Sequence, residues 1–409
     1  MPDSGVTGLS RSGQVHAVTA SFLGWMLDAL DFFVVVFMLD NLAAAFHVGK
    51  EKIVLTLTMT LVFRPVGAFI FGLLADRYGR RRPLMANVIF FSVVELLCGF
   101  APNYSVFFFL RILYGIGMGG EWGVGASLAM EAVPPRWRGI FSGLLQSGYV
   151  MGNLSAAVIA RFVLPAWGWR PMFWLGGIPA LLAFYISWSV PESEAWKQHR
   201  AQSVSGVFRA VTAQWKMFLY LILFTTFMVF LAHGTQDLYP DFLSSARHFT
   251  KAQVSEIAVI YNIGAILGSI SFGLFSERLG RRLAMIISMA LALAVIPAWA
   301  FGGSALVLIG GAFLMQAGVQ GAWGIVPVHL TEMVPDETRG LVSGLAYQLG
   351  TLFGAPAPRV EFELQKHFGY QWAIAGFEIF TILALFLILA LGKERKGRAF
   401  HRAEAIVAS

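Results

Sequence analysis

The sequence predicts an all-α membrane protein with twelve transmembrane helices, arranged as two six-helix halves. One reason is composition, because hydrophobic residues make up 57% of the 409-residue chain and charged residues only 13%, whereas roughly a quarter of the residues in soluble domains are charged. A second reason is an internal repeat: the motif that begins at Gly72 returns at Gly273, and each copy joins two long apolar runs. Duplicated membrane units of this kind are typical of proteins that work by alternating access.

Windows of about 20 apolar residues, the length of a helix that crosses a bilayer, place the predicted spans along the chain. In the first half they are 18–42, 53–75, 83–101, 104–129, 139–165 and 171–190. In the second half they are 216–241, 253–275, 283–302, 304–329, 340–362 and 370–391. The chain is thereby divided into a first half (1–191), a polar cytoplasmic linker (192–215), a second half (216–392) and a cytoplasmic tail (393–409).

The distribution of Lys and Arg predicts the orientation. Most of the 30 basic residues fall in the termini and in the loops on the same side of the membrane, so the positive-inside rule places both termini in the cytoplasm, in a multi-pass cytoplasmic membrane protein. The net charge of +7 then reflects contact with anionic lipid head groups, and it does not indicate a nucleic-acid partner. The first apolar run has no cleavage site and is expected to remain as a span.

The repeated loop lies between the second and third spans of each half. Its first copy is Gly72-x-x-Ala-Asp76-Arg77-x-Gly79-Arg80-Arg81, and the second has Glu277, Arg278, Gly280 and Arg281 at the corresponding positions. The spacing of 201 residues between the two copies also relates residues further downstream, namely Trp122 to Trp323, Glu131 to Glu332, and Arg138 to Arg339.

This loop resembles the hallmark loop of the major facilitator superfamily, and Arg111-x-x-x-Gly115-x-Gly117 resembles the fourth-span motif of that superfamily. The resemblance implies the major facilitator fold and a default monomer. It also implies a gating role for the loop residues, which would brace the cytoplasmic ends of the helices when the site is open to the outside. The alternative is that these loops only enforce topology. The predicted gating residues are Gly72, Asp76, Arg77, Gly79 and Arg80 in the first half, and Glu277, Arg278, Gly280 and Arg281 in the second.

Arg64 lies deep in the second span, where an ionised side chain costs roughly 2.5–3.5 kcal/mol on insertion scales. Its planar guanidinium can hold a carboxylate through two parallel hydrogen bonds, so Arg64 is the predicted substrate anchor. The alternative is an ion pair with Asp28 or Asp31, which share one face of the first span. The two roles can alternate, since a substrate carboxylate can displace an aspartate that then takes up a proton.

The seventh span places His233 and Asp237 four residues apart, so they lie on one helix face and could relay protons. The first half has no counterpart of this cluster, which favours a role specific to the substrate. Glu121 is a further candidate for proton coupling; alternatively, it pairs with an arginine of the cytoplasmic loops.

The run His233-x-Thr-Gln236-Asp237 resembles a signature of fungal lactate and pyruvate permeases, which belong with bacterial sialate permeases to the sialate:proton symporter family. Tyr347-Gln348-Leu-Gly-Thr351 resembles a second motif of these permeases. The resemblance implies that Arg64 and these residues line the substrate path. The resulting list of substrate-binding candidates is Arg64, Gln236, Gln348 and Thr351, with Gln146 and Asn153 at the equivalent depth of the first half.

Several function classes are disfavoured by what the sequence lacks. It has no Walker loop, no His/Cys cluster at metal-binding spacing and no Gly-x-Ser-x-Gly turn, so we expect neither an enzyme nor a bound cofactor or metal. The predicted function is symport of protons with a small monocarboxylate such as lactate. The alternatives are a sialic acid or sugar-acid symporter and, from another class, a non-transporting nutrient sensor, which the short tail after Gly392 disfavours.

Overall fold

The computed structural model describes residues 8–198 and 204–400, and the described part is helical without strands. The last nine residues of the predicted tail lie outside it. The helices of the first half are α2 (Arg11–Phe37), α3 (Leu39–Ala45), α4 (Lys50–Tyr78), α5 (Arg81–Cys98), α6 (Tyr104–Ala132), α7 (Arg138–Trp167), α8 (Arg170–Leu175) and α9 (Ala180–Ser189). The short helices α10 (Glu194–Gln198) and α11 (Val204–Ala213) lie in the predicted linker.

The helices of the second half repeat this order. They are α12 (Trp215–Gln236), α13 (Tyr239–Asp241), α14 (Lys251–Leu279), α15 (Arg281–Phe301), α16 (Ala305–Met333), α17 (Arg339–Gly354), α18 (Ala357–Phe368) and α19 (Tyr370–Leu391). Three short segments of other helical geometry complete the chain order: η1 (Pro135–Trp137) between α6 and α7, η2 (Phe242–Ala246) after α13, and η3 (Asp336–Thr338) between α16 and α17.

Within the described residues, nine helical segments are long and apolar enough to cross a membrane. The predicted spans 83–101, 104–129 and 340–362 are also helical but fall outside this set. The eleventh predicted span is divided at Ala355 into α17 and α18, each too short to cross alone, and α5 and α6 carry buried charges such as Glu95 and Glu121. The count of twelve spans therefore stays a prediction.

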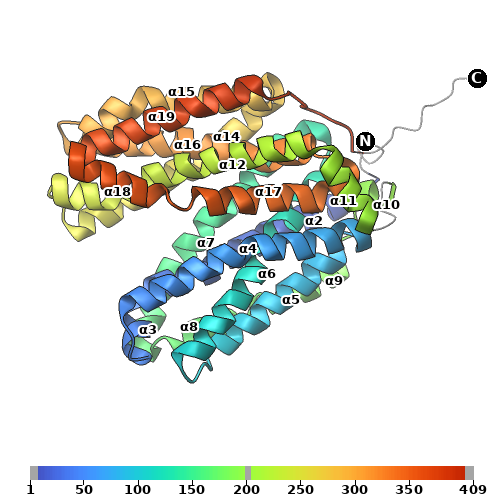
Figure 1. Cartoon of the computed structure of the whole chain (residues 1–409), viewed down its shortest axis with the longest axis horizontal. Coiled ribbons are helices and arrows are strands. Elements are labelled where there is room, and N and C mark those ends of the chain that lie inside the picture. Colours follow the sequence, from blue (N-terminus) through green and yellow to red (C-terminus); the bar gives the residue numbers. More distant parts are fainter. Residues whose placement is uncertain (1–7, 199–203, 401–409) are drawn as a thin grey trace, which may run out of the picture.

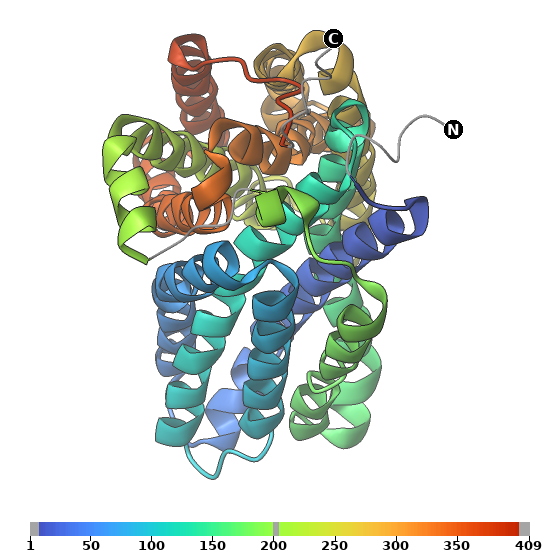
Figure 2. The ribbon, with the colours of Figure 1, turned by 90° about the vertical axis from the view of Figure 1, so that its right-hand side faces the viewer.

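The two halves lie one above the other in Figure 1, with the first half coloured blue to green and the second yellow to red. They meet through α4, α6 and α7 of the first half and α14, α16 and α17 of the second. Figure 2 looks onto the end at which α2 begins and α19 ends. We call this the gate end, defined by the loops at 76–81 and 277–282, and the opposite one the far end.

Glycines set the close approach of α4 and α6. A Cβ added at Gly115 would collide with the carbonyl of Thr60, and one at Gly119 would collide with the carbonyl of Arg64. Small residues at such crossings let two helix backbones touch, which is the usual means of packing helices in a membrane. This contact fixes the backbone position of Arg64 in the centre of the first half.

Candidate functional site

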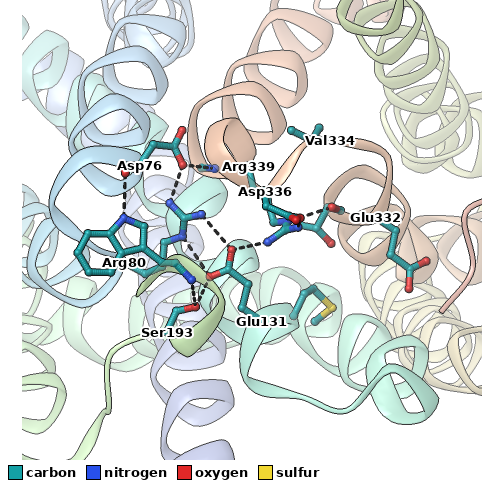
Figure 3. Close-up of polar contacts among 12 residues, drawn as sticks. Asp76, Arg80, Glu131, Ser193, Glu332, Val334, Asp336 and Arg339 are labelled. Carbon is teal, nitrogen blue, oxygen red and sulfur yellow. Dashed lines mark hydrogen bonds and ion pairs between the residues drawn. The ribbon is translucent and has the colours of Figure 1, made fainter. Parts of the chain in front are cut away.

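The gate end is closed by hydrogen bonds from one half to the other. The Asp76 carboxylate accepts the backbone N–H groups of Gly340 and Leu341, each at 2.9 Å, in the first turn of α17 (Figure 3). The first-turn N–H groups of a helix have no partner within it and carry partial positive charge, so a carboxylate is well suited to cap them. Gly72 is needed beside this contact, because a Cβ there would meet the backbone of Leu341.

Glu131 connects arginines from the two halves. It accepts hydrogen bonds from Arg80 at 2.9 and 3.2 Å and from Arg339 at 2.8 Å, and Ser193 also donates to it. Arg80 also pairs with Asp76 at 2.5 Å, and all four charged side chains are buried. Burial disfavours the charge on Arg80, but Glu131 and Asp76 outweigh that cost and raise the pKa of Arg80 above its ordinary value. The gate therefore contains a buried network in which each acid is paired with an arginine.

The second copy of the loop makes the equivalent contacts in the reverse direction. Arg281 donates to Glu332 at 2.9 and 3.1 Å, and Glu277 accepts the N–H of Gly139 in the first turn of α7. Arg138 lies 3.8 Å from Glu332 across the interface. Each half thus binds the start of a helix in the other half, as expected for two copies related by a pseudo-twofold axis.

The remaining loop residues have other positions. Gly79 and Gly280 have φ values of 103° and 93°, which only glycine adopts readily, so each ends a helix in a tight turn. Arg77 lies over the ring of Tyr78 at 5.8 Å, and Arg278 is exposed. Among the predicted gating residues, the structure places Asp76, Arg80, Glu277 and Arg281 in the charged network of the gate end.

The segment after α19 folds back onto the gate. Phe400 is completely buried, with the guanidinium carbons of Arg138 and Arg339 at 3.5 and 3.7 Å from its ring centroid. The carbonyl of Arg398 accepts from Arg138 at 2.6 Å, and its side chain donates to the carbonyl of Val334 at 2.8 Å. The tail therefore contacts an arginine of each half.

We expect Asp76→Asn to weaken the gate and slow turnover, because an amide is a poorer acceptor for the two α17 N–H groups. Hydrogen bonds to a charged group contribute about 1.5–3 kcal/mol, so the closed-to-open ratio should fall by at least about tenfold. The measurement is thiol labelling of Leu341→Cys, a buried position, against the background of Cys98, which is also buried. The control is Asp40→Asn, at an exposed ion pair, and equal labelling in both variants would contradict the prediction.

We expect Phe400→Ala to have a smaller effect in the same direction. The variant removes the aromatic face that the guanidinium groups of Arg138 and Arg339 share, and a desolvated cation–π contact contributes about 2 kcal/mol. Labelling of Leu341→Cys should become faster while the variant still folds. Phe368→Ala, at an exposed phenylalanine, is the matched control. A labelling rate no faster than that of the control would show that Phe400 contacts the gate without stabilising its closed state.

Arg64 of α4 is buried, with a side chain that is 4% exposed. Within the described residues it has no ion pair, and its Nε and Nη2 atoms have no hydrogen-bond partner. The guanidinium lies 6.0 Å from the ring of Trp25. The alternative of a permanent pair with Asp28 or Asp31 is therefore not what the structure shows, and Arg64 keeps its planar donors available.

Aromatic rings from both halves surround this position. Trp25 stacks on Tyr149 at 5.2 Å within the first half, and Trp122 stacks on Tyr347 across the interface at 3.8 Å. Trp323 meets Tyr347 edge-on at 6.0 Å. Within the described residues, the buried indole N–H groups of Trp25 and Trp122 have no partner, so they add two uncharged hydrogen-bond donors near the arginine.

The predicted amide and hydroxyl residues differ in what they contact. Gln348 is buried and donates to the carbonyl of Gly119 at 3.4 Å, while its Oε1 has no partner; the Oε1 of buried Gln146 also has none. Thr351 donates to the carbonyl four residues before it, and Asn153 is half-buried. Gln146 and Gln348 are thus the predicted amides with unused acceptor capacity.

The acids of the first span lie in the same region as Arg64 but form no ion pair with it in the described structure. Arg111 pairs with Glu95 at 2.5 Å, and Tyr114 donates to the backbone carbonyl of Asp28 at 2.9 Å. One carboxylate oxygen each of Asp28 and Asp31 is buried without a partner. Sequence reasoning missed Glu95, although an acid inside a predicted span was the signal that singled out the other candidates.

Glu121 is fully buried, and neither of its carboxylate oxygens has a hydrogen-bond partner. Its Oε1 lies where a side chain at Gly24 would stand, so it faces α2. The alternative pairing with an arginine of the gate-end loops is not found in the described structure. An unpaired carboxyl at this depth remains a candidate for proton binding.

The seventh-span cluster is divided between two roles. His233 Nδ1 and Asp237 are 2.8 Å apart, with side chains 42% and 35% exposed, so the predicted pair forms and is partly exposed. Gln236 instead donates to Gln316 of α16 at 2.9 Å, and Gln316 donates to Thr235 at 3.0 Å. Gln236 therefore connects two helices of the second half.

Two buried glutamates of the second half were also missed, Glu361 and Glu378. Each lies within a predicted apolar span, so a search for every charged residue inside such a span would have found both. The gate partners Glu131 and Glu332 were visible in the repeat, but nothing in their spacing showed that they contact arginines. The described residues contain no group of three or more His, Cys, Asp or Glu side chains that could hold a metal ion.

Comparison with known families agrees with this architecture. Residues 17–207 match a model described as "Sugar (and other) transporter", and residues 223–406 match the model of the Major Facilitator Superfamily. The chain has the fold of the proton:xylose symporter XylE, with a TM-score of 0.77 at 19% identity over 96% of this chain and 98% of that one.

Three curated relatives match most of the chain. A carboxylic acid transporter protein homolog of Saccharomyces cerevisiae is 31% identical over 87% of this chain, which spans only 62% of that protein's length. A probable 4-methylmuconolactone transporter of Cupriavidus pinatubonensis is 31% identical over 92% of this chain and 90% of that protein. The sialic acid transporter NanX of Escherichia coli is 27% identical over 95% of this chain and 96% of that protein.

Proposed function

The chain belongs to the major facilitator superfamily of membrane transporters, and on that basis we propose that it carries a small organic carboxylate across the membrane together with protons. The observation that carries this proposal is Arg64. A buried guanidinium without an ion pair is costly, and within the described residues the Nε and Nη2 atoms of Arg64 have no hydrogen-bond partner. A carboxylate is the group that its donor geometry fits best.

The surroundings of Arg64 support an organic acid as the ligand. The aromatic rings of Trp25, Tyr149 and Tyr347 exclude water from the guanidinium and offer apolar contact to a carbon skeleton. Low local dielectric strengthens the attraction between arginine and carboxylate. The names of the relatives, which include carboxylic acid and sialic acid transporters, favour the same chemical class.

Proton coupling is proposed from the unpaired acids near this centre. Asp28, Asp31 and Glu121 are buried, and each has at least one carboxylate oxygen without a partner. A carboxylate substrate brings a negative charge into this region, and binding a proton there keeps the net charge of the loaded site low. The proton would enter with the substrate from the far end and leave when the halves reorient.

The closed gate end supports alternating access. Hydrogen bonds join the halves in the described part, among them those of Asp76, Glu131 and Glu277 at the gate end. With the termini proposed to be cytoplasmic, this conformation is closed to the cytoplasm. Rocking the halves would break these contacts and open the site to the cytoplasm.

Lactate or a similar monocarboxylate is the proposed substrate, and a sialic acid or sugar acid is the second candidate. The second candidate is favoured by the unused acceptor oxygens of Gln146 and Gln348, which suit hydroxyl groups. The matched families and the relatives named above are transporters, so neither an enzyme nor a sensor is proposed.

The test is uptake into liposomes that contain the purified protein, with and without an inward proton gradient. Labelled lactate and labelled sialic acid are compared at equal concentration, with protein-free liposomes as the control. Gradient-dependent uptake of either solute supports proton-coupled carboxylate transport and identifies which candidate is correct. Uptake that ignores the gradient would refute proton coupling, and exclusive uptake of a neutral solute would refute the carboxylate.

A further inference from the structure

The second half contains two carboxyl groups that the proposed mechanism does not use. Glu361 of α18 and Glu378 of α19 are both 0% exposed, and none of their four carboxylate oxygens has a hydrogen-bond partner within the described residues. Neither has an ion pair there. Burying an ionised carboxylate without a partner is prohibitively costly, so this environment accommodates each of them as the neutral acid.

Their positions connect them to the exposed pair on α12. A Cβ added at Gly234 would overlap the Glu378 carboxyl, which places that carboxyl against the backbone next to His233. Helix α18 packs against both α12 and α19. The other charged side chains of α18, Arg359, Glu363, Lys366 and His367, are exposed. Glu361 is therefore the single acid on the buried face of its helix.

Few charged groups face this region from the neighbouring elements. Helix α12 contributes His233 and Asp237, whereas α15 has titratable side chains only at its first two residues, at the gate end. Near η2, Asp241 accepts hydrogen bonds from Ser245 and Tyr370. No cation is paired with Glu361 or Glu378 in the described structure.

We propose that Glu361 and Glu378 form an internal proton-binding site of the transport cycle, loaded from the far end through His233 and Asp237. Loading converts a carboxylate to a carboxylic acid by forming an O–H bond; the proton comes from the N–H bond of the His233 imidazolium, which becomes neutral and is protonated again by hydronium from the solvent. Release returns the proton to water once the halves have reoriented. This inference rests on the proposed proton-coupled transport and adds a second protonation site, remote from Arg64, in the other half.

The experiment compares Glu378→Gln and Glu361→Gln with wild type in proteoliposomes. Glutamine keeps the size of a neutral glutamic acid but cannot release a proton. Gradient-driven uptake by the variants should fall at least about tenfold, as for loss of a proton-transfer group. Counterflow exchange moves no net proton, so it should persist in the variants, but its rate should no longer depend on pH. Glu363→Gln, at an exposed glutamate paired with Lys366, is the matched control and should behave as wild type.

The outcomes separate the two proposals. Wild-type protein without gradient-driven uptake would refute the proposed function itself. A second outcome would overturn the inference alone. If the wild-type protein shows gradient-driven uptake, and the glutamine variants keep both this uptake and the pH profile of exchange, the two acids are permanently neutral packing groups. If Glu378→Gln does not fold, Glu361→Gln decides by the same two readouts.

Discussion

Replacing Arg64 with glutamine is expected to abolish gradient-driven carboxylate uptake while leaving the protein folded. Truncating one partner of a buried, hydrogen-bonded charge pair costs about 2–5 kcal/mol, which corresponds to a loss of affinity of at least about 30-fold. Arg64→Lys keeps the charge but loses the planar fork, so it should recover only part of the affinity. Substrate binding by calorimetry and uptake in proteoliposomes measure both effects.

The same variant separates a functional role from a structural one. Because Arg64 has no ion pair in the described structure, removing its charge relieves a desolvation cost, and Arg64→Gln should melt at the same temperature as wild type or higher. Arg161→Gln, at an exposed arginine of α7, is the control for unspecific loss of charge. A lower melting temperature combined with unchanged uptake would show that Arg64 stabilises the fold and does not anchor the substrate.

Replacing Glu131 with glutamine is expected to open the gate end. The variant leaves the buried guanidinium groups of Arg80 and Arg339 without their shared carboxylate, and breaking such a buried pair costs about 3–5 kcal/mol. Because Arg339 belongs to the other half, much of this cost falls on the closed conformation. Labelling of Leu341→Cys should become much faster, and turnover should drop because the protein no longer returns readily to the closed state.

A double-mutant cycle identifies where the energy resides. If Glu131 couples the halves through Arg339, then Glu131→Gln combined with Arg339→Gln should shift the labelling rate by much less than the sum of the single effects. Additive shifts would mean that the two residues act independently, and the gate would then depend on the Asp76 contacts with α17 instead.

Much of the fold could be predicted because its signals are local or repeated. Apolar windows place the helices, and the two copies of the glycine and arginine loop mark equivalent turns, which in the structure end α4 at Gly79 and α14 at Gly280 with positive φ. The pair of His233 and Asp237 was predictable for the same reason, since residues four apart on one helix are neighbours whatever surrounds them.

Contacts between helices were not predictable in this way. Arg64 could face Asp28, Asp31 or a ligand, and the choice depends on how α2 and α4 are rotated about their axes. Gln236 lies between the two residues of the predicted pair in sequence but points to Gln316, because α16 packs on that side of α12. The sequence alone determined the membrane helices, the duplicated halves and the residues too polar for their depth. Tertiary structure alone decided which of these have partners, because pairing depends on helix packing between segments far apart in the chain.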